Sequence, residues 1–182
     1  MSNNSTNEKK IDCAKSTLEI VNSWLGNIDQ KISYLLALST AIAGFLLSQG
    51  EPAAFKDFMA ALNTSQLSLI ILIKCGTVVL VYIFSLLSII FFLLAVKGRV
   101  KPNSSIKSHL FFGTIGEREY STYLSEYKNL VVNNEKYFEE LIEQIHTNSR
   151  ICNIKVSLYN RGLEVLAISI LLLFIAFFFK MI

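Results

Sequence analysis

Four polar residues near apolar segments have the chemistry needed to bind an anion: Lys31, Arg150, Lys155 and Asn148. Ammonium and guanidinium groups bind phosphate oxygens through charge-assisted hydrogen bonds. If the fold brings these residues together near a membrane surface, they would receive an anionic ligand such as a nucleotide phosphate. Two other interpretations stay open. Asn148 and Lys155 fall on a helix seam, where a polar residue commonly fixes register or oligomeric state, and Lys155 can equally pair with Asp29.

Residues able to carry out catalysis or hold a metal form no recognisable motif. The histidines His109 and His146 stand alone, and Cys13, Cys75 and Cys152 are far apart with no histidine at metal-ligand spacing. The sequence contains no Ser-His-Asp or Cys-His arrangement, no HExxH motif and no phosphate-binding loop. We therefore expect no enzymatic activity, no metal site and no cofactor.

The composition favours long helices in an apolar environment. Hydrophobic residues make up 52% and charged residues 17% of the 182 residues, against about 25% charged in a typical soluble domain. There are only two prolines and eight glycines. Because the net charge of +3 comes without a basic cluster, we expect no nucleic-acid polymer as a partner. The predicted fold class is all-α, in a polytopic membrane protein.

Three apolar segments are long enough to cross a bilayer, whose core requires about 20 helical residues. Residues 75–96 form a segment of 22 uncharged residues. Residues 165–179 form a shorter segment of 15 uncharged residues, and this span can extend beyond residue 179 because the Lys180 side chain can reach the membrane interface. Residues 32–49 are 18 uncharged residues, for which a re-entrant or interfacial helix is the other interpretation. Small residues in this segment recur at helical spacing and favour close approach of a second helix: Ala37, Ala41, Gly44 and Ser48.

The distribution of lysine and arginine predicts the orientation, since these residues gather on the cytoplasmic side. Residues 97–164 hold ten of them and the tail before Ile32 holds four, whereas the connection over 50–67 holds one. With three spans, the N-terminus is cytoplasmic and the C-terminus external. The chain is then a single membrane domain with six parts: a cytoplasmic tail and helix (1–31), a first span (32–49), an external loop and helix start (50–74), a second span (75–96), a cytoplasmic loop and long helix (97–162) and a third span (163–182).

Apolar residues spaced by alternating steps of four and three continue beyond the membrane segments. This heptad pattern runs from Tyr120 to Leu166 and from Ala14 to Leu35. The Asn133-Asn134 pair is a weak point where the first of these helices could break into a hairpin. We expect a cytoplasmic, coiled-coil-like helical bundle that is continuous with the membrane helices.

Three segments occur in an order and spacing that suggest a family: NIDQKISYLLAL over 27–38, FFGTI over 111–115 and QIHTNSRICNIKVSLY over 144–159. Together with the apolar spans they resemble the transmembrane effectors of bacterial Pycsar anti-phage systems. In that family an Asp-x-Lys starts the first membrane helix, an aromatic-Phe-Gly-x-Ile follows the second, and a Gln-Ile…Ile-x-x-x-Lys run precedes the third. The resemblance implies gating or register roles for Asp29, Phe112, Gly113 and Gln144.

The resemblance also implies a mode of action. A partner cyclase made active by phage infection would produce a cyclic nucleotide, which the effector would sense in the cytoplasm. The bacterial inner membrane would then lose its integrity through a pore or depolarisation, leading to growth arrest or cell death. Three helices cannot line an aqueous pore alone, so we expect a homo-oligomer in the lipid bilayer. The alternative is a membrane scaffold without a ligand, whose coiled-coil bundle recruits another protein.

Overall fold

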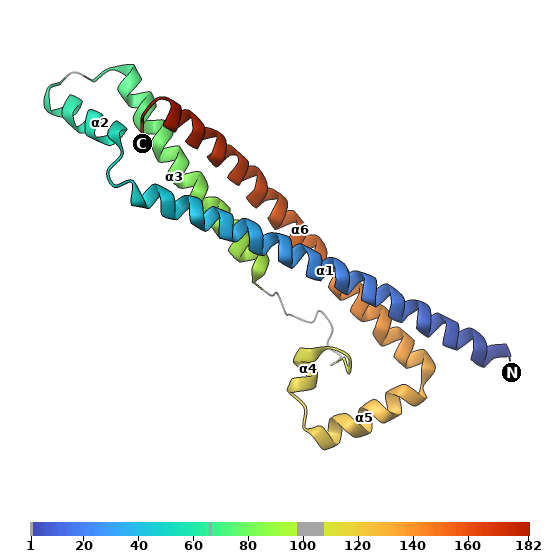
Figure 1. Cartoon of the computed structure of the whole chain (residues 1–182). Helices are drawn as coiled ribbons and strands as arrows, with labels where there is room; N and C mark the ends of the chain where they lie inside the picture. The colour runs from blue at the N-terminus through green and yellow to red at the C-terminus, as the bar shows by residue number, and fades with distance from the viewer. Residues whose placement is uncertain (1, 66, 98–107) are drawn as a thin grey trace. The chain divides into compact units, whose positions relative to one another are not determined.

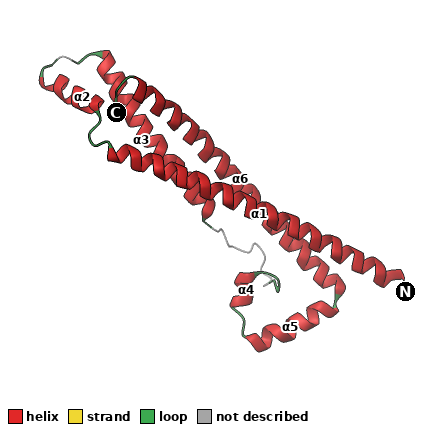
Figure 2. Cartoon of the chain, viewed as in Figure 1, coloured by secondary structure: helices red, strands yellow, loops and turns green. Residues whose placement is uncertain are grey.

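The computed structural model describes residues 2–65, 67–97 and 108–182, with side chains described from residue 7 onward except that of Phe112. Within these ranges the chain is helical and contains no strand, which confirms the predicted all-α class (Figures 1 and 2). The helices are α1 (Ser2–Ser48), α2 (Ala53–Asn63), α3 (Leu69–Val96), α4 (Phe112–Gly116), α5 (Tyr120–Val132) and α6 (Asn134–Phe178).

Three of the described helices, α1, α3 and α6, are long and apolar enough to cross a membrane. The expected second span lies within α3, and the expected first and third spans overlap the C-terminal parts of α1 and α6. Their outward faces carry large exposed side chains, including Leu69 (73%), Leu86 (60%) and Phe174 (70%). Such a surface suits lipid and would be unusual on a soluble monomer.

The long heptad segment is divided at Asn133, the weak point expected from the sequence. Asn133 has an extended backbone (φ −97°, ψ 91°) between α5 and α6. Its side-chain Oδ1 accepts a hydrogen bond from the Lys136 backbone N–H at 3.1 Å. This N-cap satisfies a donor that the first turn of α6 cannot pair internally, so a hairpin between two helices replaces one uninterrupted rod.

The chain forms two compact units, and α1 and α6 contribute to both. One unit, here called the head unit, comprises Met1–Asp29 and Gly98–Ile154; the other, the membrane unit, comprises Gln30–Lys97 and Lys155–Ile182. In the head unit a buried cluster of Ile11, Ala14 and Leu141 joins α1 to α6. Two N-terminal heptad positions predicted from the sequence contribute to this core: Ala14 is buried in it and Leu18 packs against it.

The membrane unit is packed in layers one heptad apart. Its first layer, the Leu46 layer, contains buried residues from all three long helices: Leu46, Val78, Val81 and Ala176. Tyr82 donates its hydroxyl to the Leu46 carbonyl oxygen at 3.1 Å, which links α3 to α1. The chain end is held there as well, since the Ala54 N–H donates to the Met181 carbonyl oxygen at 3.0 Å.

One heptad away from the Leu46 layer along each of the three long helices, serines occupy the buried positions in place of apolar residues. This serine layer consists of Ser39, Ser85, Ser88 and Ser169, which are 1%, 3%, 0% and 0% exposed. Ser85 Oγ and Ser169 Oγ are hydrogen-bonded at 2.7 Å between α3 and α6. Ser39 and Ser88 instead donate within their own helices, to the carbonyl oxygens of Leu35 and Ser85 at 2.8 Å.

Another heptad along, the core becomes apolar again in the Phe92 layer, which consists of Ile32, Phe92, Ala95 and Gly162. The Phe92 ring is fully buried and lies directly on Gly162. A Cβ added to Gly162 would be 2.7 Å from Phe92 Cε1. Glycine at this position therefore allows α6 to approach the aromatic ring of α3.

Substitution of Gly162 by alanine tests this close approach. Because the ring of Phe92 is fully buried, we expect Gly162→Ala to lower stability by about 1–3 kcal/mol, the usual cost of overpacking. The measurement is the thermal melting of detergent-purified protein. Gly44→Ala is the matched control, because a Cβ at Gly44 in α1 meets nothing within 4 Å and alanine favours helix by up to about 1 kcal/mol. Equal melting temperatures for the two variants would contradict the packing described.

Candidate functional site

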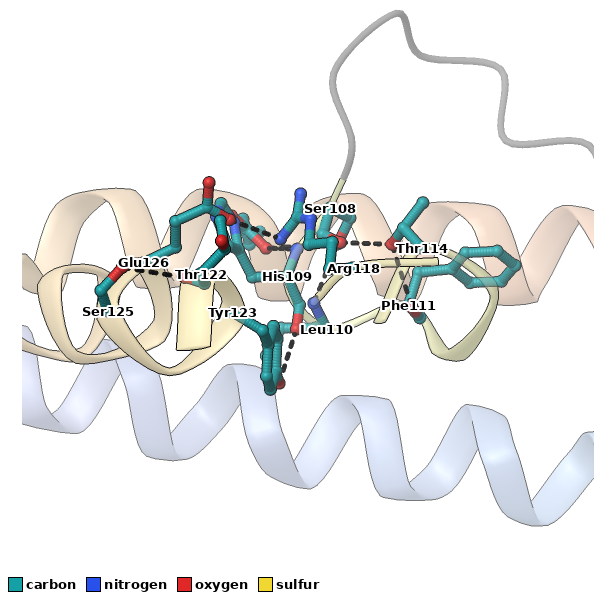
Figure 3. Close-up of polar contacts among 11 residues, drawn as sticks. Ser108, His109, Leu110, Phe111, Thr114, Arg118, Thr122, Tyr123, Ser125 and Glu126 are labelled. Atoms are coloured by element: carbon teal, nitrogen blue, oxygen red, sulfur yellow. Dashed lines mark hydrogen bonds and ion pairs between the residues drawn. The ribbon is translucent and has the colours of Figure 1, made fainter. Parts of the chain in front are cut away.

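The segment Ser108–Arg118 is held against α6 by a buried polar cluster in the head unit (Figure 3). Ser108, Glu140 and Gln144 are 6%, 8% and 7% exposed. The Ser108 hydroxyl donates to Glu140 Oε2 at 3.2 Å and accepts from Gln144 Nε2 at 3.1 Å. Glu140 and Gln144 lie four residues apart on α6, so both side chains point from one helix face to the same serine.

Glu140 is the central acceptor of this cluster. Besides the Ser108 hydroxyl, it accepts the His109 backbone N–H at 2.8 Å and contacts His109 Nδ1 at 2.5 Å. A buried carboxylate is costly unless it is paired and hydrogen-bonded, and these three contacts satisfy that need. Removal of Glu140 would leave Ser108 and His109 with buried polar groups that lack their acceptor.

His109 also faces a second carboxylate. Its Nε2 is 3.4 Å from Glu126 Oε2, and the same oxygen is 3.1 Å from Arg118 NH1. His109 therefore lies between the carboxylate of Glu126 on α5 and the carboxylate of Glu140 on α6. Tyr123 adds a hydrogen bond from its hydroxyl to the His109 carbonyl oxygen at 3.2 Å.

The FFGTI segment forms the turn next to this cluster. Thr114 donates its hydroxyl to the Ser108 carbonyl oxygen and also contacts the Phe111 carbonyl oxygen at 3.0 Å. A Cβ at Gly113 would be 2.7 Å from Cε1 of the Phe111 ring, so glycine lets the ring fold back over the turn. The side chain of Phe112, another predicted gating residue, lies outside the described residues.

The predicted gating residue Gln144 is thus placed beside the Gly113 turn, in one cluster. Asn148, a predicted ligand-binding residue, donates its side-chain amide to Asn22 Oδ1 at 2.8 Å, which links α6 to α1 within the head unit. This contact has the chemistry of a register-fixing pair. Arg150, two residues further along α6, is exposed.

The other predicted residues lie where α1 and α6 pass from one unit to the other. Lys31 is exposed and Lys155 half-buried, and both belong to the membrane unit; Asp29 is half-buried and belongs to the head unit. Neither Asp29 nor Lys155 is without an interaction partner. The four candidate ligand-binding residues are divided between the two units, so their convergence on one anion stays a prediction.

Sequence reasoning missed the Ser108–His109–Glu140 cluster because its partners lie 31 or 32 residues apart. His109 was expected to stand alone, yet it contacts two carboxylates. One signal was available: Glu140 and Gln144 are polar residues four apart, next to the apolar seam residue Leu141. Among the described residues, no group of three or more histidine, cysteine, aspartate or glutamate side chains could hold a metal ion.

Replacement of Glu140 by alanine should release the Ser108–Arg118 segment. Leaving buried donors unsatisfied costs about 1–3 kcal/mol, so we expect faster hydrogen exchange at the His109 amide, which donates to Glu140. Mass spectrometry of peptides covering residues 108–118 measures this rate. Glu139→Ala removes the same charge from an exposed neighbour and should leave the exchange unchanged. Equal protection in the two variants would show that Glu140 does not hold the segment.

Comparison with known proteins identifies the chain's relatives. Residues 13–181 match the family described as the Pycsar effector protein domain. The chain is also similar to the Pycsar effector protein GmPycTM of Gulbenkiania mobilis, with 31% identity over 167 residues that cover 83% of each protein. No solved structure matches it. The resemblance seen in the sequence is confirmed, and the protein belongs to the Pycsar effector family, with a role in anti-phage defence.

Proposed function

We propose that this effector senses a cyclic nucleotide in the cytoplasm and then disrupts the bacterial inner membrane, and that it does so without catalysing a reaction. The observation that carries the proposal is the pair of helices α1 and α6, each of which contributes to both the head unit and the membrane unit. A ligand shifts an equilibrium between two arrangements by its difference in affinity for them. Helices shared by both units are the elements through which such a shift reaches the bilayer.

Lys31, Arg150, Lys155 and Asn148 are the residues we propose for ligand binding. A cyclic nucleotide carries an anionic phosphate, for which ammonium and guanidinium groups supply charge-assisted donors. An amide such as Asn148 can donate to or accept from a base or a sugar hydroxyl. Asp29, Phe112, Gly113 and Gln144 are proposed to act in gating or register. Gln144 and Gly113 support this role best, since they lie in or beside the cluster that holds the Ser108–Arg118 segment.

The membrane lesion requires more than one copy of the chain. The membrane unit has a filled core, as the fully buried Leu46, Val78 and Phe92 show, and three helices packed around side chains enclose no aqueous passage. We therefore propose a homo-oligomer whose ligand is made by a partner cyclase. The lysine and arginine distribution supports a cytoplasmic location for the N-terminus and the head unit.

A thermal-shift panel on detergent-purified protein tests ligand sensing. The probes are cAMP, cGMP, cCMP, cUMP and cyclic di-GMP, and we expect at least one to raise the melting temperature by mass action. Loss of one charged contact costs about 1.5–3 kcal/mol, so Lys155→Ala should weaken binding by roughly 10- to 100-fold. Lys128→Ala removes the same charge from an exposed position on α5 and is the matched control. An unchanged shift in Lys155→Ala would remove this residue from the ligand site.

Dye release from liposomes that contain the protein tests the second half of the proposal. We expect release to start only when the nucleotide that raises the melting temperature is added. Intact liposomes under saturating nucleotide would refute membrane disruption. No response to any probe, together with stable co-purification of one protein partner, would instead support the scaffold interpretation.

A further inference from the structure

The contact between α3 and α6 in the membrane unit has two unusual features in adjacent layers. In the serine layer, Ser85 and Ser169 share a hydrogen bond of 2.7 Å, and Ser169 Oγ is also 3.4 Å from the Val81 carbonyl oxygen. In the Phe92 layer, the ring of Phe92 covers Gly162. Both features join the same two helices, and the residues involved are at most 3% exposed or, for Gly162, buried.

The two layers respond differently to water. A hydroxyl–hydroxyl contact between membrane helices contributes little to their association, and water can replace it because each hydroxyl can bond to water equally well. An apolar contact such as Phe92 on Gly162 has no polar group to offer to water, so it excludes water while it is closed. Because an apolar contact that excludes water lies next to a layer of hydroxyls that water can hydrate, the α3–α6 contact can exist in a closed state without water and in an open, hydrated state.

The head-unit cluster and the two layers have one helix in common, α6. The Ser108–Arg118 segment follows α3 in sequence, and it is bound to Glu140 and Gln144 of α6. Further along the same continuous α6 are Gly162 and Ser169. A change in the head-unit cluster therefore acts on α6, the helix that contributes Gly162 and Ser169 to the two layers.

We propose that activation parts α3 from α6 at the serine layer: the Ser85–Ser169 bond breaks, Phe92 leaves Gly162, and the serine hydroxyls become the hydrated lining through which water and small ions pass between copies of the chain. This inference rests on the proposed membrane disruption and specifies which helix contact opens. Ser39 and Ser88 contribute to the same lining, because they occupy the same layer and bond only within their own helices.

A reversible cross-link tests the opening directly. The parent protein carries Cys13→Ser, Cys75→Ser and Cys152→Ser, and the test variant adds Ser85→Cys and Ser169→Cys. Disulfide formation, measured by protection from a maleimide-polyethylene glycol reagent, joins α3 to α6. With cAMP, cGMP, cCMP and cUMP supplied together, we expect the oxidised variant to release no more liposome dye than samples without nucleotide. Reduction with dithiothreitol should restore release.

Thiol labelling is an independent measurement that uses single substitutions. Ser169→Cys in the cysteine-free parent should react with a membrane-impermeant methanethiosulfonate reagent only after nucleotides are added. Leu171→Cys is the matched control on α6, since Leu171 is 62% exposed on the apolar surface and should stay protected by lipid in both states. Ser169→Cys that remains unreactive in leaky liposomes would overturn the proposal, even if the double variant fails to fold.

The cysteine-free parent protein distinguishes failure of the proposed function from failure of this inference alone. If the cysteine-free parent releases no dye with any nucleotide, the proposed function fails and this inference fails with it. If the parent releases dye and the oxidised double variant releases it equally, membrane disruption stands and only the parting of α3 from α6 is refuted.

Discussion

In the hydrocarbon core of a bilayer, every backbone N–H and C=O group must find its partner inside the protein, because no water is present to replace it. The helices α1, α3 and α6 meet this requirement along their own length. Some of their polar side chains do the same: Ser39 donates to the Leu35 carbonyl oxygen and Thr77 to that of Ile73, at 2.8 and 2.9 Å. Each helix can thus exist in lipid without its neighbours. Association between them depends on close packing and a few polar contacts, which makes the membrane unit open to rearrangement.

The head unit depends on the opposite condition. The buried carboxylate of Glu140 is satisfied only by Ser108 and His109, groups from a distant part of the sequence. Such a network is costly to break in part, because each separated donor or acceptor keeps its desolvation penalty. The chain therefore combines a head unit with specific, mutually dependent contacts and a membrane unit with weaker, replaceable ones.

Periodicity made much of the fold predictable. Uninterrupted apolar length identified the three spans, and the Asn133-Asn134 pair identified the division between α5 and α6, because asparagine is a good N-cap. On α1 the heptad pattern identified the packed face as far as Leu35, since its positions Ala14, Val21, Ile28 and Ile32 are buried. Beyond Leu35 the packed face was not found: the small residues Ala37, Ala41 and Gly44 are exposed, and α1 instead buries Ser39 and Leu46. Small residues mark where a helix can approach closely, but they do not say which helix approaches.

The candidate site was less predictable than the fold. The Gly113 turn and Gln144 were identified through a family resemblance, whereas their partners Ser108 and Glu140 were missed. Hydrogen bonds between segments more than thirty residues apart leave no periodic trace in one sequence. The serine layer was missed for a related reason: serine at one heptad position resembles an ordinary small residue until three helices place four serines at the same level.

The free energies of the contacts in the two units limit how strongly a ligand must bind to shift the effector from one state to another. To move an equilibrium from 1:99 to 99:1, a ligand must favour one state by about 5.5 kcal/mol. Hydrogen bonds to charged groups contribute about 1.5–3 kcal/mol each, so two to four phosphate contacts per chain would suffice if they existed in only one state. If many strong polar contacts held the membrane unit closed, the free energy needed to open it would exceed about 5.5 kcal/mol. Under the proposed mechanism, a closed state that relies on one Ser85–Ser169 bond and on the packing of Phe92 against Gly162 would stay within reach of a single nucleotide, and the proposed homo-oligomer would add the contributions of its copies.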